Sequence, residues 1–228
     1  MPGRVLAVSP HFDDAVLSCY SMLVANPGAV VLTVFGGMPA RPVVRSWDAA
    51  CGFRDSTDAV TARRAEDLNA LSVCGASQVC LDFRDAQYDG LRTLRRGLAR
   101  AIARDLAAEV ARVSPDMLLF PLGGPWHGDH ALAARACRRL LPGLAGLMSY
   151  VYLDLPYGLT YRWSPPSDAR EIRLDSADVE PSKRDAVSCY SSQVERLREA
   201  FGINFDRAME PARERYWLVS NERAQIAG

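Results

Sequence analysis

Two short stretches hold all three histidines of this 228-residue chain, and both place histidine beside carboxylates. They read Ser9-Pro10-His11-Phe12-Asp13-Asp14 and Pro125-Trp126-His127-Gly128-Asp129-His130. Imidazole nitrogens with a carboxylate oxygen suit Zn²⁺, and Fe²⁺ or another divalent metal can use the same donors. Histidines scattered through a core would not gather in this way. The two stretches therefore predict one metal site with an attached acid and base.

The number of ligands follows from the chemistry that such a site can perform. His11 and Asp14 are three residues apart across a predicted helix start, so both can reach one ion. His127 and His130 have the same spacing. Four protein ligands would close the site, whereas a catalytic zinc keeps one position open for water. Three ligands are therefore preferred, and one histidine is held back for catalysis.

The remaining groups can supply proton transfer. Water bound to zinc has its pKa lowered to about 7, so it can attack a carbonyl at neutral pH. Asp13, adjacent to a ligand, is the natural general base. His127, with Asp129 nearby to orient it, can stabilise an oxyanion or protonate a leaving amine. This set of groups is typical of a hydrolase.

Elements of regular structure are expected to bring the two stretches together. Apolar runs bounded by polar residues or proline predict buried strands at 5–8, 30–35, 79–81, 117–120 and 147–155. Helical spacing of apolar residues predicts helices at about 13–25, 61–73, 91–113, 129–141 and 181–201, followed by a strand at 216–219. Ligands bind beyond the carboxyl ends of parallel strands, and each histidine stretch follows a predicted strand.

This alternation predicts an α/β fold, Rossmann-like, with a mostly parallel sheet, helices on both faces and a more irregular C-terminal part. We expect a single domain over residues 1–228, with a core over about 1–155 and a substrate-side segment over about 156–228. Residues 36–56 lack a periodic pattern and predict a loop, either a lid facing the substrate or a plain surface loop. Leu68 and Leu71 are expected to face inward from the helix over 61–73.

The composition limits the classes of function. The chain has 27 basic and 27 acidic residues, so its net charge of zero argues against a nucleic-acid-binding protein. No apolar run approaches the roughly 20 residues of a membrane span, and no signal peptide is visible. The six cysteines show no paired spacing, which favours reduced thiols. We expect a cytoplasmic protein with a small-molecule substrate.

The two stretches resemble the LmbE/PIG-L family of metal-dependent N-deacetylases. That family carries His-Pro-Asp-Asp-Glu after its first strand and His-x-Asp-His after a later one. The resemblance implies that His11, Asp14 and His130 bind zinc, that Asp13 is the general base, and that His127 is the second catalytic histidine. Two positions depart from the family pattern: Phe12 replaces the proline, and Ala15 replaces the glutamate.

Further matches extend this resemblance along the chain. Arg63-Arg64-Ala65-Glu66 is similar to the family's Arg-x-x-Glu helix, and Lys183 with 190–193 is similar to its late Lys…Tyr-x-Ser-Gln helix. Asp85 stands where a substrate-contacting aspartate follows the third strand. The resemblance implies substrate contacts at Arg63 and Asp85, and Trp126 can stack on a sugar face.

The function implied is removal of an N-acetyl group from an N-acetylglucosamine-type conjugate. Frequent Arg and Ala beside few Lys suggest a high-GC bacterium, where such a step would belong to secondary-metabolite or antibiotic biosynthesis. An amidase for a thiol-sugar conjugate and a non-catalytic sugar- or nucleotide-binding module are the alternatives. A non-haem Fe(II) oxygenase is a third, because His11-Phe12-Asp13 with His130 fits its ligand pattern.

Overall fold

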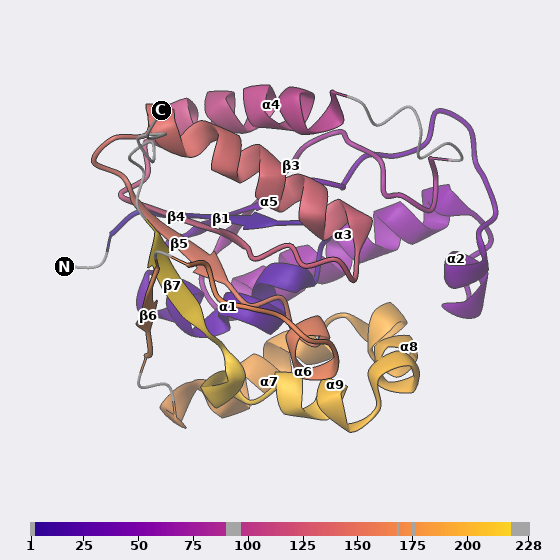
Figure 1. Ribbon diagram of the computed structural model, residues 1–228. Coiled ribbons are helices and arrows are strands. Elements are labelled where there is room, and N and C mark those ends of the chain that lie inside the picture. Colours follow the sequence, from indigo (N-terminus) through magenta and orange to yellow (C-terminus); the bar gives the residue numbers. More distant parts are fainter. Residues whose placement is uncertain (1–2, 90–96, 168, 175–176, 220–228) are drawn as a thin grey trace.

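The computed structural model describes residues 3–89, 97–167, 169–174 and 177–219, and within them seven strands form one sheet. The strands are β1 (Val5–Ser9), β2 (Val30–Thr33), β3 (Ser77–Cys80), β4 (Met117–Pro121), β5 (Met148–Tyr152), β6 (Arg170–Ile172) and β7 (Tyr216–Val219). Their spatial order is β3-β2-β1-β4-β5-β7-β6 (Figure 1). The first five strands are parallel, whereas β7 and β6 are antiparallel to their neighbours.

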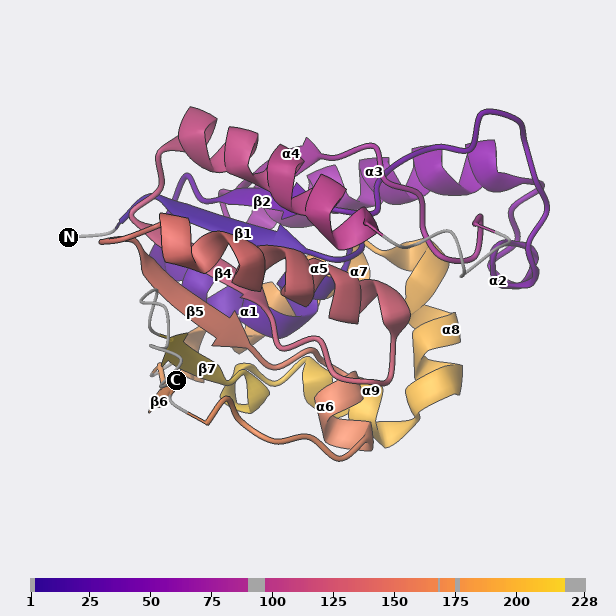
Figure 2. The ribbon, with the colours of Figure 1, turned by 45° about the horizontal axis from the view of Figure 1, so that its top comes forward.

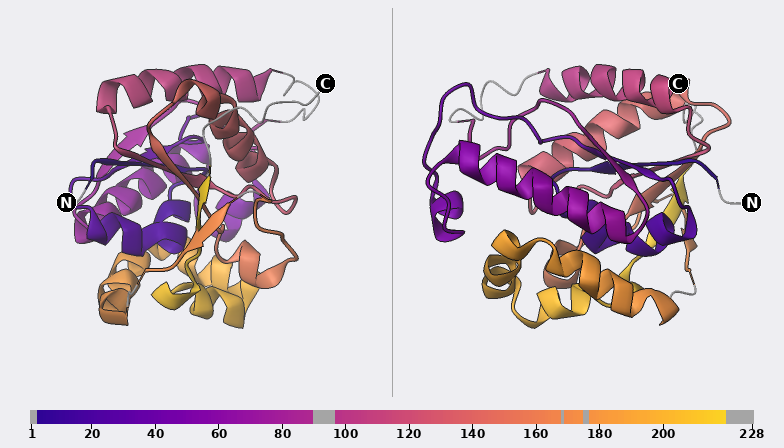
Figure 3. Two further views of the ribbon diagram at one scale, coloured as in Figure 1. Left: turned by 60° about the vertical axis from the view of Figure 1, so that its left-hand side comes forward. Right: turned by 180° about the vertical axis from the view of Figure 1, so that it is seen from behind.

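Helices cover both faces of this sheet. They are α1 (Asp14–Ala25), α2 (Ser46–Ala50), α3 (Ser56–Val73), α4 (Leu98–Val113), α5 (Gly128–Leu140), α6 (Tyr157–Thr160), α7 (Glu180–Ser188), α8 (Ser191–Phe201) and α9 (Ile203–Ala208). Short 3₁₀ turns lie at Leu141–Gly143, Ala177–Val179 and Pro211–Arg213. Helices α4 and α5 pack together on one face, and α1 and α3 lie on the other, where α7 contacts both (Figure 2). Figure 3 shows α6 to α9 gathered on the α1 side.

The predicted fold class is confirmed. The apolar run of β1 is completely buried between β2 and β4, as expected for a central parallel strand. The strand order reverses direction between β1 and β4, because the chain winds outward from β1 to β3 and then crosses back to β4. Such a reversal opens a crevice at the carboxyl ends of the two strands. This is where the two histidine stretches begin.

Two expectations about α3 and the loop before it need correction. The loop over 36–56 contains the short helix α2, and α3 begins at Ser56 rather than Thr61. Asp55 explains the earlier start, since its side chain caps the helix by accepting from the backbone of Thr57 at 2.7 Å. Leu68 is 51% exposed, so the expectation that it faces inward was wrong. Its neighbour Asp67 takes the buried position instead.

The two later helices also differ from the expected spans. The described part of the predicted 91–113 helix begins at Leu98, and Leu91 and Leu94 lie outside the described residues. The predicted 181–201 helix is two helices, α7 and α8, which are separated at Tyr190. Glu66 of α3 accepts hydrogen bonds from the backbone and hydroxyl of Ser192, so it caps the start of α8. Within the described ranges no helix is long and apolar enough to cross a bilayer.

The buried ion pair of Lys183 and Glu214 bonds the backbone groups that an interruption in α1 leaves without helical partners. Cys19 has non-helical backbone angles (φ −142°, ψ 29°), and a regular helix would join the Ser21 N–H to the Leu17 carbonyl across it. Here the Ser21 N–H donates to Glu214 at 3.0 Å, and the Leu17 carbonyl accepts from Lys183 Nζ at 2.8 Å. Lys183 and Glu214 are 2.7 Å apart. The pair therefore holds the first turns of α1, which carry Asp13 and Asp14.

We expect Lys183→Met to lower the free energy of unfolding by about 3–5 kcal/mol, because it leaves Glu214 buried without its counter-charge. Lys183 is fully buried and Glu214 is 6% exposed. The matched control is Arg184→Met on the same helix, whose exposed pair with Glu180 is worth at most about 1 kcal/mol. Urea unfolding measures both variants. Equal losses in the two variants would contradict a structural role for the buried pair.

Candidate metal centre

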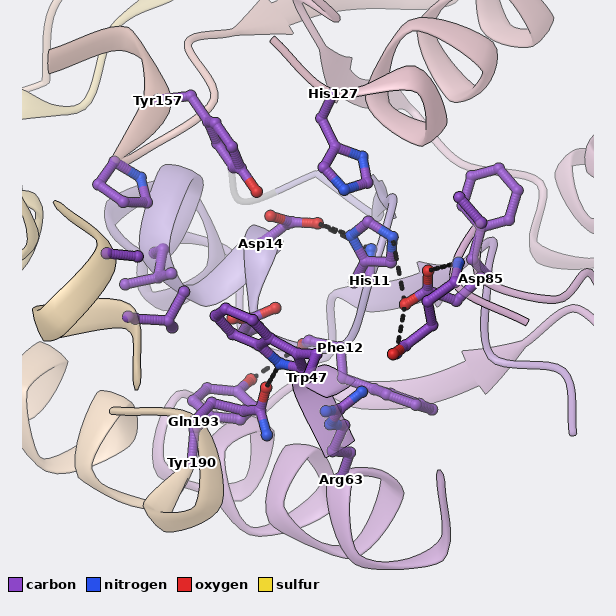
Figure 4. A pocket seen from close by; sticks show the side chains of 18 of the residues that line it. His11, Phe12, Asp14, Trp47, Arg63, Asp85, His127, Tyr157, Tyr190 and Gln193 are labelled. Atoms are coloured by element: carbon purple, nitrogen blue, oxygen red, sulfur yellow. Dashed lines mark hydrogen bonds and ion pairs between the residues drawn. The ribbon is translucent and has the colours of Figure 1, made fainter. Parts of the chain in front are cut away.

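The two histidine stretches meet in the crevice between β1 and β4. His11 lies in the turn after β1, and Asp14 begins α1. His127 is the N-cap residue of α5, and His130 lies in its first turn. Figure 4 shows His11, Asp14 and His127 facing one another at the upper end of a cavity. The cavity has a volume of about 360 Å³.

Asp14 lies at the spacing of a fellow metal ligand from two of the histidines. Asp14 Oδ2 lies 3.2 Å from His11 Nδ1 and 3.3 Å from His130 Nε2. Two ligands on a tetrahedral Zn²⁺ with bonds of about 2.0 Å are roughly 3.3 Å apart. His127 also offers a nitrogen within 4.8 Å of a nitrogen on each of the other two histidines. The cluster supports a divalent metal ion.

An unsatisfied buried atom supports the same conclusion. His130 is fully buried, and its Nε2 has no hydrogen-bond partner among the described residues. A buried polar atom without a partner is costly unless an ion or water completes it. On the other side of the ring, His130 Nδ1 bonds Asp154 Oδ1 at 2.6 Å. A carboxylate on the distal nitrogen is the usual way to orient a metal-binding histidine.

Asp154 was not among the predicted site residues. It follows β5 and is 1% exposed, and its second oxygen accepts from the backbone of Gly123 at 3.0 Å. The sequence carried one usable signal, since an aspartate after a third neighbouring strand lies at the same sheet edge. Its pairing with His130 requires β5 to lie beside β4, and this strand order cannot be read from the sequence.

Asp129 contacts the cluster differently from the expectation. Its carboxylate lies 3.3 Å from His11 Nε2 and accepts from the Ala86 N–H at 2.8 Å. The contact that reaches His127 comes from the Asp129 backbone, whose N–H donates to His127 Nδ1 at 3.3 Å. The carboxylate therefore orients His11, and the main chain orients His127. An accepting Nδ1 places the proton of neutral His127 on Nε2.

The two adjacent aspartates have opposite protonation tendencies. Burial and then the charge of Asp14 raise the pKa of Asp13 to about 6. Burial also acts to raise the pKa of Asp14, but His130 and His11 hold it well below its usual value. Burial, with His11 and His130 nearby, lowers the pKa of His127 to about 4. The site thus pairs an ionised Asp14 with a carboxylate that can take up a proton near neutral pH.

Two of the three predicted substrate contacts line the cavity. Arg63 is held by Asp48 at 2.9 Å, and Asp85 lies 4.0 Å from His11 Nε2. Trp126 is not among the described lining residues. Its ring stacks on Tyr157 and Tyr161, each 6.4 Å away between centroids. Trp126 therefore packs against these two tyrosines, and its role in stacking on a sugar stays a prediction.

Tyr157 is the cavity residue that the sequence predictions missed. Its ring lies 4.9 Å from that of His130, and its hydroxyl points toward Asp14 and His127 in Figure 4. It comes from α6, directly after the cis Leu155–Pro156 peptide bond. The folded chain brings it from the turn after β5.

Comparisons with known proteins agree with this geometry. The model of the family described as PIG-L, GlcNAc-PI de-N-acetylase, matches residues 6–141, which include both histidine stretches. The 2'-N-acetylparomamine deacetylases of Streptomyces fradiae and Niallia circulans are each 30% identical, over 81% and 82% of this chain. These matches cover 63% and 79% of the two relatives, so the chain spans less than two thirds of the Streptomyces fradiae protein.

Two solved structures extend the similarity over nearly the whole chain. The A40926 pseudoaglycone deacetylase is 27% identical with a TM-score of 0.80, covering 97% of this chain and 99% of that one. A triple mutant of a deacetylase from the teicoplanin biosynthetic pathway is 28% identical with a TM-score of 0.77, covering 94% and 97%. All four relatives are named as deacetylases.

Proposed function

The chain belongs to the PIG-L (GlcNAc-PI de-N-acetylase) family, and on that premise we propose that it removes an N-acetyl group from an N-acetylglucosamine-type conjugate. The observation that carries the proposal is the meeting of His11, Asp14 and His130 in one cavity with Asp13. Named relatives acting on acetylated amino sugars support the substrate class, and a role in antibiotic biosynthesis is part of the proposal.

We assign the metal site to His11, Asp14 and His130, with zinc as the proposed ion. When bound there, zinc would act as a Lewis acid and lower the pKa of a water molecule to about 7. The donor set fits, because two imidazoles and one carboxylate are a common zinc-binding set and the buried Nε2 of His130 makes no hydrogen bond among the described residues. Asp129 and Asp154 would orient the two ligand histidines.

The other side chains would transfer the proton of the attacking water and stabilise the negative charge that develops on the carbonyl oxygen. Asp13 accepts the proton lost by the attacking water, and that proton then passes to the nitrogen of the breaking C–N bond. The products are acetate and the free amine. His127 presents its Nε2–H to the developing oxyanion, because its Nδ1 is occupied by the Asp129 N–H. The Tyr157 hydroxyl points toward Asp14 from beside His127, so it can donate to the same oxyanion (Figure 4).

We expect Tyr157→Phe to lower kcat by about 10²-fold with little change in KM, since it removes one oxyanion donor. The matched control is Tyr161→Phe, because Tyr161 also stacks on Trp126 but is 52% exposed and lies outside the described cavity lining. Steady-state kinetics on an N-acetylglucosaminide measures both. Equal activity in the Tyr157 variant and wild type would remove Tyr157 from the mechanism.

Amine release from N-acetylglucosaminides tests the proposed reaction directly. The purified protein is assayed as isolated, after chelation, and after zinc, Fe²⁺ or Co²⁺ is restored. We expect activity to disappear with the chelator and return with a divalent ion. An absence of metal-dependent release from every acetamido sugar would overturn the proposal and leave the binding-module alternative. The response to each ion identifies the metal.

We also propose that the whole chain works as one domain in the cytoplasm. The cavity is lined both by the early part, with His11 and Arg63, and by the late part, with Tyr157 and Gln193, which supports a single unit. All six cysteines are free thiols, which is consistent with a reducing compartment. The segment after residue 156 supplies the substrate side of the cavity in this proposal.

A further inference from the structure

The cavity beside the metal centre has a second, apolar part. We call it the apolar wall, and its residues are Leu17, Trp47, Val60, Leu197, Ala200 and Phe201. The last three lie at i, i+3 and i+4 on α8, so they form one face of that helix. Figure 4 shows Trp47 across the cavity from Tyr157 and His127. The wall is therefore built from four helices that are far apart in the sequence.

Polar atoms in and beside this wall are occupied by protein partners. Trp47 Nε1 donates to Gln193 Oε1 at 2.9 Å, and Gln193 Nε2 donates to Ser192 Oγ at 2.9 Å. The Tyr190 hydroxyl bonds Asp67 Oδ1 at 2.7 Å. Because these polar atoms already have partners, the surface that the Trp47 ring and α8 present to the cavity is apolar. A ligand gains from this wall mainly by burying apolar area.

The Tyr157 ring lies between the apolar wall and the histidines of the metal centre. The Phe201 ring lies 5.0 Å from the Tyr157 ring, edge to face. The Tyr157 ring in turn lies 4.9 Å from His130 and 6.0 Å from His127. A sugar whose amide lies at the histidines would thus place an attached group directly against Phe201 and its neighbours on α8.

The carboxylates among the described lining residues lie at the metal end of the cavity and not on the apolar wall. The described lining carboxylates are Asp13, Asp14 and Asp85, and Asp14 and Asp85 contact His11. The lining also contains the cation Arg63. Its partner Asp48 is fully buried and already bonded by Arg63 and the Tyr88 hydroxyl. The six residues of the apolar wall thus offer an ammonium group no carboxylate.

We propose that the apolar wall is a subsite for an uncharged apolar substituent on the amino sugar. The inference rests on the proposed deacetylase function and narrows its substrate class. Sugars carrying an aryl or alkyl group are then preferred to multiply cationic aminoglycosides, although two curated relatives are named for 2'-N-acetylparomamine. The apolar group is either the aglycone or an acyl chain longer than acetyl, and the two sources are separable by experiment.

Two series of substrates test the proposal. One compares the methyl, phenyl and octyl glycosides of N-acetyl-β-glucosamine, and the other compares N-acetyl, N-butyryl and N-octanoyl groups on the methyl glycoside. We expect kcat/KM to rise by at least about tenfold along one series, chiefly through KM, which identifies the source of the apolar group. A flat response along both series, or a preference for 2'-N-acetylparomamine, would overturn the proposal.

Variants show whether the effect comes from the apolar wall. Leu197→Ser and Ala200→Trp should both bring the ratio between the favoured substrate and the methyl N-acetyl glycoside close to one. Ala200 is at the exposed mouth, so its replacement does not disturb the core. The matched control is Ile203→Ser, because Ile203 is 70% exposed and lies outside the described lining. An unchanged ratio in both wall variants would place the preference elsewhere.

Calorimetric binding separates this proposal from the deacetylase function. Phenyl β-glucosaminide and methyl β-glucosaminide are amines that need no turnover, so their affinities can be measured even if no substrate is hydrolysed. We expect the phenyl compound to bind at least about tenfold more tightly. Equal affinities together with a flat N-acyl series would overturn the subsite, whereas tighter phenyl binding without any metal-dependent amine release would overturn only the proposed reaction.

Discussion

Asp13→Asn is expected to lower kcat by about 10²–10⁴-fold, the usual contribution of a positioned general base. Asparagine has nearly the same shape but cannot accept the proton of the attacking water. Asp13 lines the cavity beside the metal ligands, and burial with the Asp14 charge raises its pKa to about 6, close to the range in which a base is effective. Single-turnover kinetics with a saturating N-acetylglucosaminide measures the chemical step.

The metal content of this variant decides between two roles for Asp13. We expect metal bound per chain, measured by mass spectrometry after dialysis, to stay near the wild-type value. Loss of the metal would mean that Asp13 is a ligand and that the roles of the two aspartates are exchanged. Asp58→Asn is the matched control, because Asp58 pairs with Arg54, lies outside the described cavity lining and should leave both rate and metal content unchanged.

The central strands and the two histidine stretches were predictable because each rests on a local signal. Buried parallel strands appear as apolar runs, and the loops that follow them share one sheet edge whatever the details of packing. His11, Asp14, His127 and His130 therefore meet as the sequence predicts. Their individual roles remain predictions, since a spacing of three residues is equally compatible with a ligand and with a catalytic group.

The residues that escaped prediction depend on contacts between distant parts of the chain. Asp154 matters because β5 lies beside β4, and Tyr157 matters because the turn after β5 folds back over His130. Neither has a local pattern that sets it apart. The stacking of Trp126 on Tyr157 and Tyr161 is likewise a contact between distant parts of the chain, and its role toward the substrate remains a prediction.

The structure also explains how the two departures from the family motif are accommodated. Phe12 is 6% exposed and lines the cavity, and its carbonyl accepts a hydrogen bond from the Tyr190 hydroxyl. Ala15 is fully buried, and its N–H donates to Ser9 Oγ at 3.0 Å. Neither side chain carries a donor atom for a metal, so the proposed ligand set does not depend on them.

The Fe(II) oxygenase alternative fits the fold and the geometry poorly. Those enzymes typically use an all-β barrel, whereas this sheet is mostly parallel and covered by helices. The alternative would also use Asp13 as the carboxylate ligand. In the structure Asp14 is the carboxylate that contacts both His11 and His130. The family comparison favours a deacetylase for the same residues.

His130→Ala is expected to abolish metal binding and, with it, turnover. The variant removes a buried ligand whose Nε2 lies beside Asp14 and makes no hydrogen bond among the described residues. A metal that binds only the folded state raises the free energy of unfolding, by about 2.7 kcal/mol when its concentration is 100 times its Kd. The melting temperature rises as a result. We expect zinc to stabilise the wild type and to leave His130→Ala unchanged, a readout that does not depend on activity.

Two graded variants sharpen this result. Asp154→Asn keeps the ligand but loses the carboxylate that orients it, so metal affinity should fall by about 10–100-fold. His127→Ala is the decisive control, because the proposed three-ligand site keeps its metal without His127 while turnover falls. If zinc stabilised the His127 variant as little as it stabilises His130→Ala, all three histidines and Asp14 would be ligands. The site would then be closed by four protein donors, and the hydrolytic mechanism would lose the open position that it needs.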